Sequence, residues 1–165
     1  DLVRTLDNGL QPVRWHGSRG VPALDRRAPI RFAPGAIGNV RELLVSAQHK
    51  ILVSGWRAEL FFGEDEVLVA AAHLVNADTI HRAPRRYIDY HHLMFDRHEV
   101  LLAEGVPTES FYPDEYILQD YALREGIEHL FPEMIGLVGR GWEAARTVLG
   151  GQEAKVLCGD ILHVA

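Results

Sequence analysis

The chain of 165 residues contains a single cysteine, Cys158, and this scarcity excludes an intramolecular disulfide and any zinc site built from several cysteines of this chain. The sequence also has no apolar run close to the roughly 20 residues that a membrane-spanning helix needs. We therefore expect no membrane partner. Cys158 lies in the apolar segment AKVLCGD, which favours a buried structural thiol over a reactive one.

Basic patches are also scarce, although the charge is unevenly distributed. The formal net charge is −6, and the acidic surplus lies after residue 60, whereas the first 60 residues carry more basic than acidic side chains. No basic stripe with interleaved aromatic residues is present, so we expect no nucleic-acid partner. The N-terminal segment DLVRTLDNGLQPVRW shows no signal peptide. Localisation stays unknown, and a secreted precursor remains open.

The first two thirds of the chain consist of short β-branched and aromatic segments separated by Gly, Pro, Asn or Asp. The expected strands fall within residues 10–17, 29–39, 42–46, 50–55, 59–69, 86–95, 98–105 and 106–111. Only residues 70–78 indicate a helical turn in this part. Many short strands without long intervening helices predict a mainly β domain over residues 1–112.

After Pro113 the pattern changes to a helical period. We expect a helix within residues 114–131, where Tyr116, Leu123, Ile127 and Leu130 fall near one face. Residues 141–160 predict one or two shorter helices, interrupted at Gly150 and Gly151 because glycine disfavours a helix interior. Residues 113–165 are thus expected to be a helical C-terminal extension packed on the β domain.

Ser46 and His49 lie three residues apart in LLVSAQHKILVS, where one apolar strand gives way to the next. A hydroxyl and an imidazole at such a corner can converge on one peptide group, and protonation of the leaving amide nitrogen is what makes rearrangement of a peptide bond feasible near neutral pH. The alternative is that Ser46 ends a strand and His49 is a structural turn histidine.

Nine histidines in this length invite a metal hypothesis, but their spacing argues against it. His91 and His92 are adjacent, so on a strand they point to opposite faces, and no H-x-x-x-H helix motif exists. We expect no metal and no cofactor. A small metal-dependent hydrolase stays an alternative, and stoichiometric metal in the purified protein would reveal it.

Two long segments carry a family resemblance. LLVSAQHKILVSGWRAELFFGEDEVLVAAAHLVN and YHHLMFDRHEVLLAEGVPTESF closely resemble the bacterial branch of the Hint (Hedgehog/intein) family, and the match extends over residues 1 to 112. The resemblance implies a Hint-type fold, a pseudo-symmetric β horseshoe. It also implies self-processing, in which the domain cleaves itself from an upstream segment of the same precursor through a thioester. That upstream polypeptide is the expected partner.

The resemblance implies roles for particular residues. SAQH matches the family's T-x-x-H block, which places Ser46 at the hydroxyl position and His49 at the histidine that activates the scissile amide. In the late block, His91 or His92 would assist the second step, with His92 favoured. Asp96 and His98 lie close by in the same block, although His98 could simply bond a turn.

Two departures from the family pattern stand out. Hint domains begin with a nucleophilic Cys, sometimes Ser, whereas this chain begins with Asp1. Inteins end with His-Asn, whereas the aligned residues here are Glu109 and Ser110, which excludes asparagine cyclisation. We therefore expect the 165 residues to be inactive by themselves. The alternative is a non-catalytic binding or structural module on a Hint scaffold.

Overall fold

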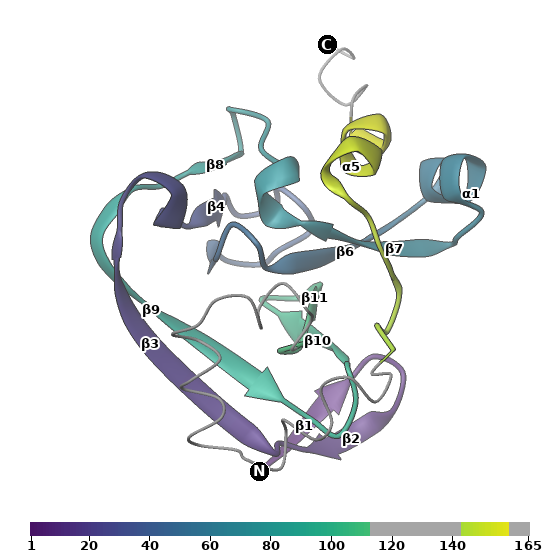
Figure 1. Cartoon of the computed structure of the whole chain (residues 1–165), viewed down its shortest axis with the longest axis horizontal. Coiled ribbons are helices and arrows are strands. Elements are labelled where there is room, and N and C mark those ends of the chain that lie inside the picture. Colours follow the sequence, from purple (N-terminus) through teal and green to yellow (C-terminus); the bar gives the residue numbers. More distant parts are fainter. Residues whose placement is uncertain (113–142, 159–165) are drawn as a thin grey trace.

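The computed structural model describes residues 1–112 and 143–158 (Figure 1). The fold is mainly β, which confirms the expected class. The strands are β1 (Leu2–Thr5), β2 (Gly9–Pro12), β3 (Trp15–Ala23), β4 (Ile30–Phe32), β5 (Leu43–Val45), β6 (Lys50–Ser54), β7 (Glu66–Ala70), β8 (Ile80–Arg82), β9 (Arg85–Met94), β10 (Val100–Ala103), β11 (Val106–Glu109) and β12 (Thr147–Val148). The helices are α1 (Trp56–Phe62), α5 (Gly151–Cys158) and the 3-10 turns η1 (Asp25–Arg27) and η2 (Ala71–His73). None of the helices in these ranges is long and apolar enough to cross a membrane.

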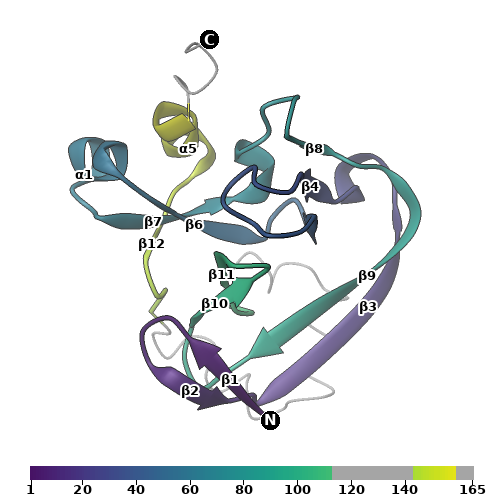
Figure 2. The ribbon, with the colours of Figure 1, turned by 180° about the vertical axis from the view of Figure 1, so that it is seen from behind.

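The strands form three sheets. The largest has the order β12-β7-β6-β11-β10-β1-β2, a second is the two-stranded β3–β9 ribbon, and the third has the order β5-β4-β8. In Figures 1 and 2 the long β3–β9 ribbon curves along one side of the molecule, from the β1–β2 hairpin at one end to β4 and β8 at the other. The β10–β11 hairpin lies between the ribbon and β6, and this arrangement brings β6, β9 and β11 near one another.

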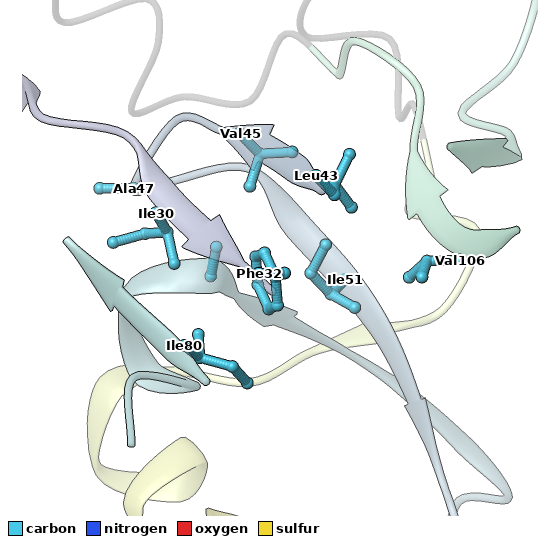
Figure 3. Close-up of a cluster of buried hydrophobic side chains, with 9 residues drawn as sticks. Ile30, Phe32, Leu43, Val45, Ala47, Ile51, Ile80 and Val106 are labelled. Atoms are coloured by element: carbon cyan, nitrogen blue, oxygen red, sulfur yellow. The ribbon is translucent and has the colours of Figure 1, made fainter. Parts of the chain in front are cut away.

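The main hydrophobic core lies where the small sheet meets β6 and β11 (Figure 3). Its central side chains are Ile30 and Phe32 of β4, both with 0% of their surface exposed. The core also contains Leu43, Val45, Ala47, Ile51, Ala71, Ile80 and Val106. Because Leu43, Val45 and Ala47 alternate with more exposed neighbours, burying them on one face fixes the direction in which the corner after β5 points.

A tight turn joins β10 to β11. Glu104 and Gly105 both have positive φ angles, 53° and 87°. Two such residues form the two-residue turn whose twist suits an antiparallel hairpin, and the pairing of Ala103 with Val106 confirms that register. The register continues to the pair Val100 and Glu109, so the hairpin delivers Glu109 to the end of β11 that lies beside β6.

The strand expected within residues 59–69 is wrong in its first part, because Trp56–Phe62 form helix α1. Gly63 ends this helix in the left-handed conformation with φ 69°, and its N–H donates to the carbonyls of Ala58 and Glu59. The remaining residues form β7 as expected. The apolar pair Phe61 and Phe62 fits either a strand or a short helix, and the glycine cap decides between them.

The C-terminal part is only partly helical in the described residues. The helix expected within 114–131 lies outside them. The expected interruption at Gly150 and Gly151 is confirmed, since α5 begins at Gly151, but the expected helix before it is wrong. There, Thr147 and Val148 form β12 parallel to β7, because that strand edge offers unpaired backbone groups. We call residues 143–150, which run along β7 to α5, the strap.

Candidate functional site

Ser46 and His49 occupy the corner between β5 and β6. The His49 N–H donates to the Ser46 carbonyl at 3.1 Å, which closes a tight turn. The next turn, η2, holds this corner from behind: the Ala71 N–H donates to the His49 carbonyl at 2.9 Å and the Ala72 N–H to the Ala47 carbonyl at 3.0 Å. The corner is therefore fixed by its backbone, which leaves both side chains free to serve another purpose.

A cavity of about 340 Å³ opens in front of this corner. Its wall combines the β5–β6 corner with β9, β10 and β11. The lining residues are Val3, Leu43, Leu44, Val45, Ser46, His49, Asp89, Tyr90, His91, His92, Leu93, Leu101, Leu102, Ala103, Thr108, Glu109 and Phe111. Four of the six residues singled out in the sequence, Ser46, His49, His91 and His92, thus meet at one cavity, although they come from strands far apart in the chain.

The imidazole of His49 is neutral at physiological pH. Burial lowers its pKa to about 4, and the nearby His92 and Lys50 lower it too, whereas the Glu109 carboxylate acts in the opposite direction. Within the described residues, neither the His49 ring nor the Ser46 hydroxyl makes a hydrogen bond to another side chain or to the backbone. Both groups can therefore bond to a molecule or peptide group that enters the cavity.

Glu109 is the residue that the sequence analysis did not select for the site. Its Oε1 accepts a hydrogen bond from the Lys50 N–H at 2.9 Å, and its Oε2 lies 3.2 Å from Lys50 Nζ. Burial acts to raise the pKa of Glu109, but the contacts with His98, Lys50 and His49 outweigh it and lower that pKa. The carboxylate is thus charged and braces the backbone next to His49.

His98 lies behind Glu109, away from the cavity. Its side chain is 0% exposed, and its ring stacks on Tyr112 with centroids 4.5 Å apart. Nδ1 accepts a hydrogen bond from the Ala145 N–H at 3.1 Å. Nε2 lies 3.5 Å from Glu109 Oε2, which is long for a hydrogen bond, and this buried polar atom has no hydrogen-bonding partner in the described residues.

His91 and His92 have different surroundings, as adjacent strand residues should. His92 packs edge-on against Phe111, and burial lowers its pKa, with Glu109 opposing this effect. His91 is exposed and stacks on His16 of β3, where His16 Nε2 and His91 Nδ1 are 3.2 Å apart. Of the two, His92 is the one that interacts electrostatically with both His49 and Glu109.

Asp96 is placed outside this cluster. Its carboxylate accepts two hydrogen bonds from the Arg14 guanidinium, both at 2.8 Å, and the two side chains are 61% and 55% exposed. This surface pair ties the end of β9 to the segment before β3. The ion pair with Arg14 therefore accounts for Asp96 as a structural residue, without any contact to a substrate.

Among the described residues, neither a metal-binding cluster nor a thiol lies at this cavity. Among residues 1–112 and 143–158, no group of three or more His, Cys, Asp or Glu side chains is arranged to hold a metal ion. Cys158 lines a different cavity of about 450 Å³, with Ile37 and Leu74 among its neighbours, and burial raises the pKa of its thiol. A buried thiol with a raised pKa is a poor nucleophile.

The fold and the cavity together define a class: a mainly β domain in which a strand corner presents a hydroxyl and a neutral imidazole to an open cavity. A family model described as "Hint domain" matches residues 1–115. The chain therefore belongs to the Hint domain family. Searches of curated proteins and of solved structures found no match.

Proposed function

We propose that this Hint domain is a self-processing domain, which cleaves itself from an upstream segment of its precursor by N–S acyl rearrangement. The observation that carries the proposal is the β5–β6 corner, where the Ser46 hydroxyl and the neutral His49 ring face one cavity without partners among the described residues. Both groups line the cavity, so a peptide group that enters it can supply their hydrogen bonds. A bacterial source for the chain is part of the same proposal.

In the first step, a thiol at the start of the domain attacks the carbonyl carbon of the peptide bond before it. The new C–S bond forms, the C–N bond breaks, and the thiol proton ends on the released amine, so the product is a thioester. Ser46 donates its O–H to the carbonyl oxygen, where negative charge develops in the tetrahedral intermediate. The hydroxyl lies on a backbone turn that is already closed, which lowers the cost of ordering it.

The low pKa of His49 suits a proton relay. Because the ring is neutral at pH 7, it can accept the proton of the attacking thiol. The resulting imidazolium, with a pKa of about 4, is a strong acid and passes its proton to the leaving amide nitrogen. Glu109 makes the charged state of His49 less costly, because its carboxylate acts to raise the pKa of the ring.

In the second step, an acceptor with an exchangeable proton, such as water or a thiol, attacks the thioester and releases the domain. We assign the assisting role in this step to His92, which lines the same cavity and is neutral because burial lowers its pKa. A neutral imidazole can take the proton of the acceptor and return it to the leaving thiolate.

The proposal requires a thiol nucleophile from an upstream segment, since Cys158 lines another cavity. Val3 of β1 is part of the cavity wall. A segment that leads into β1 would therefore lie close to the cavity wall in the chain. The upstream polypeptide is at once the partner and the substrate.

The test uses the precursor with its encoded upstream sequence and a folded reporter protein in front. We expect thiol-stimulated release of the reporter, a loss of roughly 10²–10⁴-fold in its rate for His49→Ala, and a smaller loss for Ser46→Ala. His92→Ala should let the thioester accumulate, and Gln48→Ala, which alters an exposed neighbour, should change nothing. An unchanged rate for His49→Ala would refute the assignment.

Cys158 lines a different cavity from Ser46 and His49, and this favours one alternative, a non-catalytic binding or structural module on the Hint scaffold. This alternative predicts a precursor that stays intact with every variant. It also predicts that His49→Ala changes stability but no reaction. The reporter assay therefore separates the two functions in one experiment.

A further inference from the structure

The strap is fastened to the β domain by contacts that the family match does not include, since that match ends at residue 115. Arg146 donates to both oxygens of Asp7, at 2.8 and 3.1 Å, and to Glu66 Oε2 at 2.7 Å. The Leu149 N–H donates to the Leu68 carbonyl at 2.9 Å. These bonds connect the strap to the β1–β2 turn and to β7, and hold its backbone in one position.

That position places one backbone amide on a buried ring. The Ala145 N–H donates to Nδ1 of His98, so Nδ1 must offer its lone pair and cannot carry a proton. The ring is neutral as a result, and its proton lies on Nε2. Tyr112 covers one ring face. The strap thus decides which nitrogen of a fully buried histidine is the donor.

The donor nitrogen faces the site. Nε2 has no hydrogen-bonding partner in the described part of the chain, and Glu109 Oε2 lies 3.5 Å from it. Glu109 in turn holds the Lys50 N–H and ammonium, directly after His49 in the chain. A line of contacts therefore runs from the strap through His98 and Glu109 to the corner that presents His49 to the cavity.

We propose that the strap positions residues of the candidate site. The Ala145 amide fixes the proton of His98 on Nε2. This N–H then directs the Glu109 carboxylate toward the corner that carries His49. His98 and Ala145 are positioning residues in this scheme, since neither touches the cavity. With the opposite tautomer, Nε2 would present a lone pair to a carboxylate, and the two would repel each other. The effect on reaction rate rests on the proposed self-processing function, whereas the tautomer does not.

The first experiment needs no reaction. The 165-residue chain, labelled with ¹⁵N-histidine, is examined by long-range ¹H–¹⁵N correlation NMR near neutral pH, and the His98 signals are assigned by their loss in His98→Gln. We expect the Nε2–H tautomer in the wild type and in Ala145→Gly, which keeps the amide. Ala145→Pro removes the donor N–H, so we expect loss of that single tautomer and a mixture with the Nδ1–H form. A wild-type His98 in the Nδ1–H or charged form, or a pure Nε2–H form in folded Ala145→Pro, would overturn the proposal.

A second variant covers the case in which Ala145→Pro does not fold. Arg146→Ala removes the hydrogen bonds to Asp7, to Glu66 and to the Ala145 carbonyl but keeps the Ala145 N–H, and we expect it to broaden or mix the His98 tautomers. Its matched control is Arg41→Ala, which breaks a similar two-bond pair with Glu104 on the surface, at 2.8 and 2.9 Å. Arg41→Ala should leave the His98 signals unchanged. Equal spectra for Arg146→Ala and wild type would also overturn the proposal.

The second experiment measures rate in the precursor. Outer-shell partners that orient the ligands of metal sites typically matter by about 10–100-fold, and by analogy we expect a loss in this range for Ala145→Pro, with Ala145→Gly near the wild-type rate. If no variant of the precursor cleaves, the proposed function fails while the tautomer result stands. If the precursor cleaves and Ala145→Pro shifts the tautomer without slowing cleavage, the role of the strap in the reaction is refuted.

Discussion

Folding stability should depend on pH through His49, and the structure gives the sign. The pKa of His49 falls from 6.5 in the unfolded chain to about 4 in the folded protein, mainly because the ring is buried. Between these values the unfolded state binds a proton that the folded state does not. Stability is therefore highest above about pH 6.5 and is lost as the pH falls toward 4.

The size of the effect follows from the two pKa values. Lowering the pH from about 7.5 to about 5 should cost at most about 2 kcal/mol through His49, because the full shift corresponds to 1.36 kcal/mol per unit and is only partly expressed at pH 5. The figure is an upper limit because the ring keeps some access to solvent through the cavity. His92 acts in the same direction. Glu109 does not contribute in this window, since its lowered pKa matters only below about 4.5.

Urea unfolding at the two pH values tests this reasoning. Wild type should lose up to about 2 kcal/mol more than His49→Gln between about pH 7.5 and about pH 5, because glutamine cannot titrate. Gln48→Ala, an exposed and uncharged neighbour in the same turn, should lose as much as wild type. If His49→Gln and wild type lose the same amount, the His49 ring is not held neutral by burial and the proton-relay role has no basis.

Four further outcomes are expected. Glu109→Gln should lower the pKa of His49 still further in an NMR titration, because the carboxylate now acts to raise it, and an unchanged or higher value would contradict the assigned contact. Phe32→Ala should lower the free energy of unfolding by about 3–5 kcal/mol, as measured with urea. Leu60→Ala, at an exposed position of α1, should change it by no more than about 0.5 kcal/mol. Equal effects of the two substitutions would contradict the assignment of Phe32 to the core. Gly63→Ala should cost about 1–2 kcal/mol because alanine resists the left-handed cap, and a neutral result would argue against that conformation. The mass of the 165-residue chain should stay constant with added thiol, since Cys158 lines a different cavity, and any self-cleavage would show that Cys158 or another group reaches the site.

Much of the β fold could be predicted from local sequence. Glycine and proline punctuation separates the strands, and the two-residue turn at Glu104 and Gly105 marks the β10–β11 hairpin. The helix α1 could not be separated from a strand, because seven residues with paired aromatics fit both periods and only the left-handed cap at Gly63 decides between them. The strand β12 was missed because its pairing with β7 depends on an open sheet edge.

The candidate site was predictable only where its residues share a motif. Ser46 and His49 stand out by spacing at a strand corner, and the family resemblance added His91 and His92. Glu109 was noted only as a departure from the intein ending, although a glutamate in the otherwise apolar and hydroxyl-bearing segment VPTESF is a signal of a buried charge. Its contact with Lys50 depends on the pairing of β11 with β6, which no local pattern reveals.

The contact between Ala145 and His98 could not be predicted from the sequence. Its hydrogen bond joins residues 47 positions apart through a backbone amide, and backbone donors leave no trace in side-chain patterns. Asp96 is the opposite case, because the sequence places it with the candidate site residues but the structure does not. It lies in the same sequence block as His91 and His92, but its carboxylate pairs with Arg14 on the molecular surface.

The most direct test of the central claim is the intact mass of the products after the precursor is incubated with a small thiol. N–S acyl rearrangement predicts an upstream fragment whose mass carries one thiol molecule in place of water, together with a released domain that begins at the nucleophile. The same fragment should be lost in His49→Ala. An upstream fragment that ends in a free carboxylate and forms equally in His49→Ala would mean ordinary proteolysis, and it would contradict the account of the β5–β6 corner as the place where the peptide bond is rearranged.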